Sequence, residues 1–422
     1  MRLVPLATLA VVFVLIAVRR VGPWRMPIWL VMLGGALAVL ATGQIAPAAA
    51  LRAINLDVML SLFGLFVVGH AMEDSGYLSQ LSYRLFRHAR STDALVILIL
   101  VVMGLGSALL MNDTIAIVGT PIVLYMARAH GIAPRLLLHA LMLAVTTGGA
   151  MSPLGNPQNL LVAVEGGLNN PFVSFGRLLS VPTLIGLALT YLALRLAYGR
   201  DFHRLPLSHQ AMAPRDPSLA ALSRLSLILV VVLILAKIAL FALRTGFDLP
   251  LTAIALAAAA PVLLASPKRF RLLAAMDWPT LVFFAAMFVL MRSVWDSGLP
   301  QWALQRGGVN LASLELVMVV AVVGSQLVSN VPLVALLLPM IGASAGASAG
   351  ASAGVQVLVG LAAASTISGN LLILGAASNV IVIQNAERRT GDTVSFLEFL
   401  RVGAPLTAAQ CAVYWGYLRL FS

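Results

Sequence analysis

The chain has 422 residues, of which 60% are hydrophobic and only 10% are charged. Soluble domains are about 25% charged, so this composition excludes an ordinary globular protein. The formal net charge is +12, but the basic residues stand in short loops between apolar stretches, which is typical of membrane topology and argues against a nucleic-acid partner.

Apolar stretches follow one another along the whole chain. A helix needs about 20 mostly apolar residues to cross a bilayer. The stretches cover residues 3–18, 27–43, 57–72, 94–127, 136–163, 178–197, 225–243, 249–265, 279–294, 314–341, 355–384 and 402–420. They predict an all-α polytopic membrane protein. The first stretch is flanked by Arg2, Arg19 and Arg20, so we expect a membrane helix there and not a cleaved leader.

The two halves of the chain resemble each other. Gly106, Ser107, Asn112 and Pro121 recur 218 positions later as Gly324, Ser325, Asn330 and Pro339. Gly149, Gly155, Asn159 and Val162 recur 220 positions later as Gly369, Gly375, Asn379 and Val382. The nearly constant spacing predicts two repeats, over residues 1–197 and 223–422. A polar linker over 198–222 joins them, and its basic residues place it in the cytoplasm.

The stretch 94–127 is too long for one tidy span, and polar residues 112–114 interrupt it. It is either one long crossing or a re-entrant hairpin. Cytoplasmic loops are enriched in Lys and Arg. If 94–127 and 314–341 are both hairpins and the N-terminus is outside, 19 of the 27 basic residues face the cytoplasm and six face outside, with two in spans. If both stretches cross, the split is 12 against 13, so the charges favour hairpins.

The hairpin topology makes the two repeats inverted. Each half then has about five spans, an odd number, and the second half is upside down relative to the first. One hairpin, about 93–127, enters from the cytoplasm, and the other, about 314–341, enters from the outer side. This plan predicts a secondary transporter of the inner (plasma) membrane, with its site at the repeat interface.

Polar interruptions at membrane depth mark the candidate site, because irregular backbone survives there only inside protein or beside a wet cavity. They occur at the two hairpin tips and at two helix breaks, residues 152–159 and 375–379. The candidate substrate- and ion-binding residues are Ser107, Asn112, Asp113, Thr114, Gly155, Asn156, Asn159, Ser325, Ser329, Asn330, Gly375, Ser378 and Asn379. Carbonyl, amide and hydroxyl oxygens suit Na⁺, which we place at Ser107, Asn112, Asp113 and Gly155. For any single residue the alternative is a side chain that bonds back to a kinked helix.

Asp113 stands apart, because a carboxylate inside the membrane is costly and predicts a function by default. Its counterpart in the second half is Val331. We expect Asp113 to bind Na⁺ or to carry a coupling proton. The alternative is a capping role at the start of the second hairpin helix.

Residues 107–114, Ser-Ala-Leu-Leu-Met-Asn-Asp-Thr, followed by Thr120 and Pro121 and by residues 148–159, resemble the ion transporter superfamily. Its members include arsenite efflux permeases, sodium–proton antiporters, citrate–metal transporters and divalent-anion–sodium symporters. Residues 152–159 are most similar to the citrate-transporter-like or arsenical-pump-like branch. The resemblance implies a scaffold, a mobile part and elevator-type alternating access. Symporters of the superfamily carry Ser-Asn-Thr at both tips; neither tip here is intact, which disfavours a dicarboxylate.

These features predict an ion-coupled secondary transporter for a small anion or arsenite, with Na⁺ or H⁺ as coupling ion and no other cofactor. The alternative is a Na⁺/H⁺ antiporter without an anion substrate. A membrane enzyme is disfavoured, because the spans hold no metal or nucleophile cluster. No P-loop is present, so we do not expect this chain to hydrolyse ATP itself. The expected partners are a small ionic substrate and the lipid bilayer, while a homodimer and an external ATPase subunit stay open. We also expect an amphipathic helix over 78–90 and a flexible linker over 342–354.

Overall fold

A computed structural model gives the fold. It describes residues 3–18, 20–21, 24–25, 27–77, 80, 86, 89–202, 215–243, 247, 249–299, 302, 311, 313–328, 330–345, 351–391 and 393–421. Ser329, most of the predicted amphipathic helix over 78–90 and the middle of the predicted 342–354 linker lie outside these residues. The ends of that linker prediction were wrong, because helices extend to Ala345 and restart at Ala351. Alanine is the strongest helix former, which accounts for the extension.

The described residues are almost entirely helical, as predicted. The first half contains α1 (Val4–Val18), α2 (Ile28–Ala41), α3 (Pro47–Ala53), α4 (Leu56–Asp74), α6 (Thr92–Leu110), α7 (Asn112–His130), α8 (Pro134–Gly149), α9 (Pro157–Glu165) and α10 (Pro171–Ala197). The second half contains α11 (Pro217–Ala242), α12 (Leu251–Ala265), α13 (Arg269–Ala275), α14 (Trp278–Asp296), α16 (Leu314–Val328), α17 (Asn330–Ala345), α18 (Ala351–Ile367), α19 (Ala377–Thr390) and α20 (Phe396–Leu420).

The remaining elements are short. Three 3-10 turns are η1 (Gly199–Asp201), η2 (Ser368–Asn370) and η3 (Ile373–Gly375). One antiparallel strand pair, β1 (Arg20–Val21) with β2 (Trp24–Arg25), departs from the all-α prediction. It spans only two residues on each side and connects α1 to α2.

α4 and α14 begin and end alike. Asn55 and Asp277 cap their N-termini, each accepting a hydrogen bond from the backbone N–H three residues later. Both helices end before a serine and then a glycine, and Gly76 and Gly298 have φ of +74° and +75°. Glycine takes this left-handed conformation without the steric cost of a Cβ. The similar helix ends accord with the predicted duplication.

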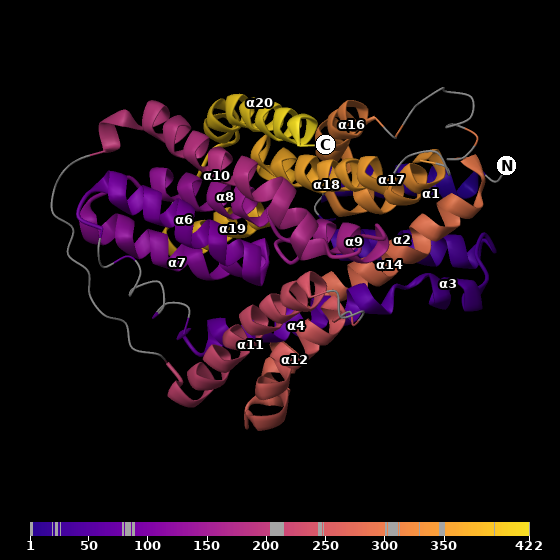
Figure 1. The fold of residues 1–422 in the computed structure, drawn as a ribbon, viewed down its shortest axis with the longest axis horizontal. Coiled ribbons are helices and arrows are strands. Elements are labelled where there is room, and N and C mark those ends of the chain that lie inside the picture. The colour runs from indigo at the N-terminus through magenta and orange to yellow at the C-terminus, as the bar shows by residue number, and fades with distance from the viewer. Residues whose placement is uncertain are drawn as a thin grey trace.

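The helices form two groups (Figure 1). α4 packs against α11 and α12, and these three form the lower part of the view, while α14 packs on α2. The second group contains α6 to α10 and α16 to α20; α6 and α7 both pack on α8, and α19 packs on α7. We name α1–α4 with α11–α14 the first group, and the other helices the second group.

Glycines let the second group pack closely. A Cβ on Gly148 would lie 2.3 Å from the Cα of Gly104, so α8 crosses α6 with backbones in contact. A Cβ on Gly155 would lie 2.0 Å from the Gly149 carbonyl oxygen. These contacts fix the first hairpin, α6 with α7, against the break between α8 and α9.

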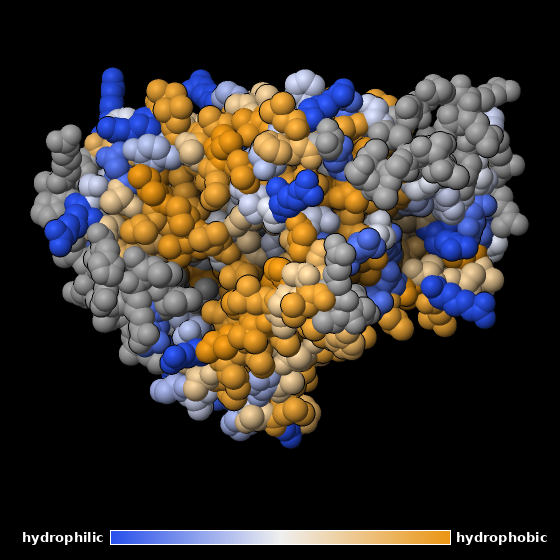
Figure 2. All heavy atoms as spheres, viewed as in Figure 1, coloured by the Kyte–Doolittle hydropathy of each residue, from blue (hydrophilic) through white to orange (hydrophobic). Residues whose placement is uncertain are grey.

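The exterior is rich in apolar side chains. Hydrophobic residues dominate much of the face shown in Figure 2, including the region of α11 and α12. On α11, Ile228, Val232 and Leu235 are exposed. Among the described residues, α4, α6, α10, α11 and α14 are long and apolar enough to cross a membrane. Lipid is the solvent that such a surface requires.

Candidate functional site

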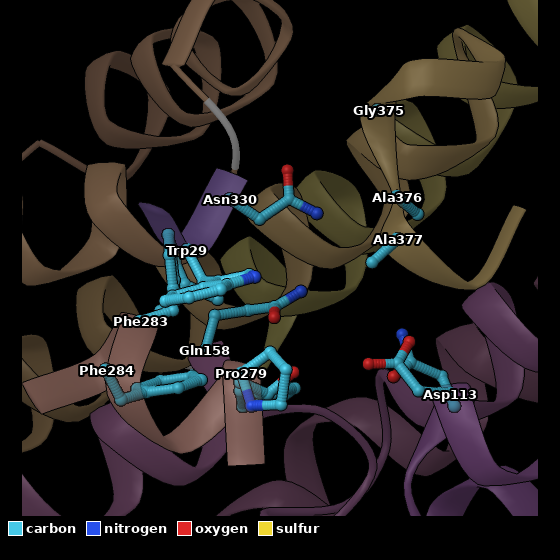
Figure 3. A pocket seen from close by; sticks show the side chains of 14 residues that line it. Trp29, Asp113, Gln158, Pro279, Phe283, Phe284, Asn330, Gly375, Ala376 and Ala377 are labelled. Atoms are coloured by element: carbon cyan, nitrogen blue, oxygen red, sulfur yellow. The ribbon is translucent and has the colours of Figure 1, made fainter. Parts of the chain in front are cut away.

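A cavity of about 260 Å³ lies where the two hairpin tips, the two helix breaks and the first group meet. Figure 3 shows aromatic side chains on one side and Asp113 with residues 375–377 on the other. The lining residues are Trp29, Asn112, Asp113, Pro157, Gln158, Pro279, Thr280, Phe283, Phe284, Asn330, Val331, Gly375, Ala376 and Ala377. The cavity therefore brings together segments that are more than 300 positions apart in the sequence.

The first tip turns at a single residue. Met111 has φ of +70°, the only positive φ at a non-glycine among the described residues, and α7 begins directly after it at Asn112. The Asn112 backbone N–H donates to the Gly155 carbonyl over 2.8 Å. The tip is thus tied to the first break, while the buried Asn112 side-chain oxygen has no hydrogen-bond partner among the described residues.

Asp113 lies in the first turn of α7 and lines the cavity. One of its carboxylate oxygens is buried and has no hydrogen-bond partner among the described residues. The N-cap residue of α7 is Met111, so Asp113 lies inside the first turn, and its buried oxygen accepts from no backbone N–H of the described residues. A buried oxygen without a partner is a strong acceptor for a cation or a proton.

Ser107 lies behind the tip. Its hydroxyl donates to the Val145 carbonyl over 2.7 Å. The Cβ position of Gly149 is 2.9 Å from the Ser107 Oγ and 3.2 Å from the Gly155 carbonyl oxygen. The Ser107 hydroxyl and the Gly155 carbonyl therefore both lie beside Gly149, and the same carbonyl accepts from the Asn112 N–H.

Asn156 and Asn159 stabilise the first break. The Asn159 amide nitrogen donates to the carbonyl oxygens of Gly149 and Ser152 at 3.1 and 3.0 Å. The Asn156 side chain caps α9 by accepting from the Asn159 backbone N–H. Thr366, from the second half, accepts from the Asn156 amide and donates to the Asn159 oxygen, both at 3.0 Å. These side chains satisfy the backbone that the break exposes.

The second break is less fully bonded. The Asn379 amide donates to the Gly369 carbonyl over 2.7 Å, as Asn159 does to Gly149. Its side-chain oxygen has no partner among the described residues, and the Thr146 hydroxyl, the counterpart of Thr366, has none either. Ser325 and Ser378 also carry buried hydroxyls without described partners.

Gln326 joins the second tip to its break. Its amide nitrogen donates to the Ser368 carbonyl over 2.9 Å, and the Ser368 hydroxyl donates to the Asn330 side-chain oxygen over 3.3 Å. The Cβ position of Gly375 lies 3.1 Å from the Gln326 side-chain oxygen. Among the described residues, the Gln326 side-chain oxygen itself has no hydrogen-bond partner.

Four helices begin at the cavity. Their first residues are Asn112 of α7, Pro157 of α9, Asn330 of α17 and Ala377 of α19. Among the described residues, no side chain caps α7 or α19, whereas Asn156 caps α9, which begins with a proline. The first N–H of α7 is donated to the Gly155 carbonyl. The helix dipole still gives each N-terminus a partial positive charge that attracts an anion, and the N–H groups without a side-chain cap are those of α7 after Asn112 and those of α19.

Some of the predicted site residues line the cavity, and most of the others lie just behind it. Asn112, Asp113, Asn330 and Gly375 line the cavity. The predicted residues just behind it are Ser107, Gly155, Asn156, Asn159, Ser325, Ser378 and Asn379. Thr114 points away, because its Oγ is 2.7 Å from the Cβ position of Gly69 on α4. A ligand role for each residue stays a prediction.

The sequence reasoning missed the wall that the first group contributes. Trp29 from α2 and Phe283 and Phe284 from α14 line the cavity, with Gln158 from the first break. Gln158 lies within the polar run that marked the break, so the signal was available. The aromatic residues belong to ordinary apolar spans, and no local pattern distinguishes them.

Two basic residues within spans have other roles. Lys237 is buried and donates to the Leu249 carbonyl over 2.8 Å. Arg292 pairs with Asp296 one turn later, at 3.0 Å. Neither lines the cavity, and its described lining contains no Lys, Arg or His.

The chain was compared with known proteins. A sequence profile of the citrate transporter family, CitMHS, matches residues 11–356. The uncharacterized transporter Rv2684 of Mycobacterium tuberculosis is 29% identical over 384 residues, covering 87% of this chain and 86% of the relative. The human P protein is 24% identical over 448 residues, covering 86% of this chain and 53% of the relative.

Solved structures share the fold. The YdaH transporter of Alcanivorax borkumensis superposes with a TM-score of 0.60 at 17% identity, covering 99% of this chain and 97% of that one. MtrF of Neisseria gonorrhoeae, described as an antimetabolite efflux pump, gives a TM-score of 0.56 at 14% identity, with 99% and 94% covered. The family profile covers most of the chain, so the chain is a multi-pass membrane transporter that belongs to the citrate transporter family.

Proposed function

We propose that the protein is an ion-coupled secondary transporter that moves a small anion, or arsenite, across the inner membrane. One observation carries the proposal: four helix N-termini meet at a single cavity between the two tips. N-termini attract an anion, and oxygens at the adjacent helix ends attract a cation. The family name, citrate transporter, also points to an anionic substrate.

The coupling ion is Na⁺ or H⁺ in this proposal. The oxygens of Ser107 and Gly155 both lie beside Gly149 at the first tip, and Asn112 and Asp113 each add a side-chain oxygen without a described partner. A cation or proton at Asp113 would remove the negative charge that opposes an anion in the same cavity. Binding of the two ions would therefore be coupled through the charge of one side chain.

Elevator motion of the second group against the first is supported by the positions of the tips. Thr114 at the first tip faces Gly69, five residues before Asp74 at the end of α4. The second tip shares the cavity with Phe283, five residues after Trp278 at the start of α14. In an inverted-repeat topology these helix ends lie on the same, cytoplasmic side. Both tips are then displaced toward the cytoplasm, as in an inward-facing state.

The proposed topology places the N-terminus outside and the linker over 198–222 in the cytoplasm. It rests on the distribution of Arg and Lys, which favours two re-entrant hairpins. The similar caps of α4 and α14 support the duplication. A homodimer fits the proposal.

A Na⁺/H⁺ antiporter is the second candidate, favoured by Asp113 and by the lack of basic residues in the described lining. Proteoliposomes with a trapped pH dye separate the two candidates. They are pulsed with sodium chloride, then with sodium salts of citrate and other anions, and then with arsenite. A signal that needs one of the anions or arsenite supports the proposal. Proton efflux with sodium chloride alone, lost in Asp113→Asn, supports the antiporter and removes the proposal.

A further inference from the structure

The walls of the cavity differ in chemistry. The second group supplies Asn112, Gln158 and Asn330 together with the helix N-termini. The first group supplies Trp29, Phe283 and Phe284. In Figure 3 the three aromatic side chains lie on one side of the cavity, with Gln158 and Asn330 near them, while Asp113 and residues 375–377 lie on the other. A ligand that satisfies both walls must have two unlike ends.

The polar end calls for one negative charge. α19 begins at Ala377 without a side-chain cap, so its first N–H groups are available at the cavity. Asn112 is only 6% exposed, and its side-chain oxygen has no described partner. This acceptor is a second, independent indication of a bound species at this wall, namely a coupling cation or a donor group that accompanies the anion. Helix N-termini stabilise a single anionic group well. Nothing in the described lining is a cation that could balance further charges.

Asp113 limits the charge of the ligand. It is the only ionisable side chain of the described lining, and it brings one negative charge. A coupling cation or proton at Asp113 cancels that charge, and the helix ends then remain for the ligand. A trianion such as citrate would bury charges without partners, which is strongly unfavourable.

The other end calls for a flat apolar group. Trp29 comes from α2 and the two phenylalanines from α14, and Pro279 continues the same wall. Aromatic rings bind flat apolar groups through stacked and edge contacts. A cavity of about 260 Å³ is below the usual range for drug-sized ligands, so the ligand is small.

We propose that the ligand of this cavity is a small monoanion with a flat apolar body. Its anionic group lies at the helix N-termini of the second group, and its body lies on Trp29, Phe283 and Phe284. The proposal rests on the proposed function, because it names the class of anion at the same site. It also makes the aromatic wall of the first group the determinant of specificity.

Equilibrium binding to the full-length protein in lipid nanodiscs tests this proposal. The probes are benzoate, which has both features, acetate, which lacks the flat body, and citrate, which carries three carboxylates, each with saturating sodium at pH 7. We expect benzoate to bind about tenfold more tightly than acetate, from burial of a phenyl ring. Citrate should bind more weakly than benzoate.

Substitutions in the aromatic wall test whether this wall binds the ring of benzoate. Phe283→Ala should bring the affinity for benzoate down to nearly that for acetate, and Trp29→Leu is the second variant of the wall. Phe270→Ala, on the exposed surface of α13, is the matched control and should keep the wild-type ratio. The proposal is overturned if citrate binds as tightly as benzoate, if benzoate does not bind, or if both wall variants keep the wild-type ratio.

The two proposals fail separately. Preferential benzoate binding without any anion-dependent flux in proteoliposomes would remove the transport proposal and keep the ligand class. Citrate-driven flux together with absent benzoate binding would keep the transport proposal and remove the ligand class.

Discussion

The two helical hairpins occupy related positions in the chain but differ in chemistry and in register. The first tip carries Asp113, where the second carries Val331. Ser107 at the first hairpin has its hydroxyl bonded to Val145, whereas the hydroxyl of its counterpart Ser325 has no described partner. The comparison indicates that the two tips, although placed alike in the two halves of the chain, offer different chemistry, with a carboxylate at the first tip alone.

The two tips also contact the helices of the first group at different depths. The first tip faces Gly69 near the end of α4, and the second lies beside Phe283 near the start of α14. Two inverted halves in a symmetric arrangement would place both tips at equivalent depths on these helices. If each tip moved to the depth that the other now holds, the first tip would lie beside Leu62, two helical turns before Gly69 on the same face of α4. At 1.5 Å per residue the shift is roughly 10 Å.

The largest difference expected between the tips is in coupling. Asp113→Asn should lower ion-coupled flux by about 10- to 100-fold, since contacts to a charged group contribute about 1.5–3 kcal/mol. Val331→Asn at the second tip is the matched control and should change flux far less. Initial rates in proteoliposomes with equal protein content measure both. Equal losses in the two variants would show that the tips do not differ in this role.

A smaller effect is expected where the first tip touches α4. Gly69→Ala places a methyl group 2.7 Å from the Thr114 Oγ, and overpacking of this kind costs about 1–3 kcal/mol. The variant should disfavour the conformation in which Thr114 lies beside Gly69, and it should therefore change the affinity for substrate. Thr114→Ala removes the clashing atoms and should restore the wild-type affinity in the double variant. Independent, additive effects would indicate that the two residues do not meet.

The smallest effect concerns the two breaks. Thr366→Val removes both hydrogen bonds to Asn156 and Asn159, and each is worth about 0.5–1.5 kcal/mol. The counterpart, Thr146→Val, removes a hydroxyl without a described partner and should be nearly neutral. Thermal unfolding in detergent should therefore give a lower midpoint for Thr366→Val alone. Similar midpoints for the two variants would contradict the unequal bonding of the breaks.

The sequence predicted the helical fold, and it located the tips and breaks, because glycine, proline and polar residues within apolar stretches are unusual. It also found Asn112, Asp113, Asn330 and Gly375 of the cavity. It did not find Trp29 or Phe283, since an aromatic residue inside a membrane span has many uses and only tertiary packing decides among them.

Asn156 and Asn159 were expected to bind substrate or ions, with a bond back to the kinked helix as the alternative. Their hydrogen bonds to Thr366 were not predicted, because these depend on how the two halves meet. Such contacts between distant residues have no local signature in the sequence. The Gly-Ala-Ser run was expected to be a linker from its composition, whereas helices α17 and α18 extend into both of its ends.

Disulfide trapping tests the central claim, motion of the tips against α4, most directly. In a Cys411→Ser background, Gly69→Cys with Thr114→Cys should cross-link readily, because the two Cβ positions are 3.4 Å apart, close to disulfide geometry. Leu62→Cys with Thr114→Cys samples the exchanged register. The account predicts that both pairs cross-link in membranes, that substrate and sodium change their proportion, and that each cross-link blocks flux until reduced. Active transport with no Leu62–Thr114 cross-link under any ion or substrate condition would contradict it.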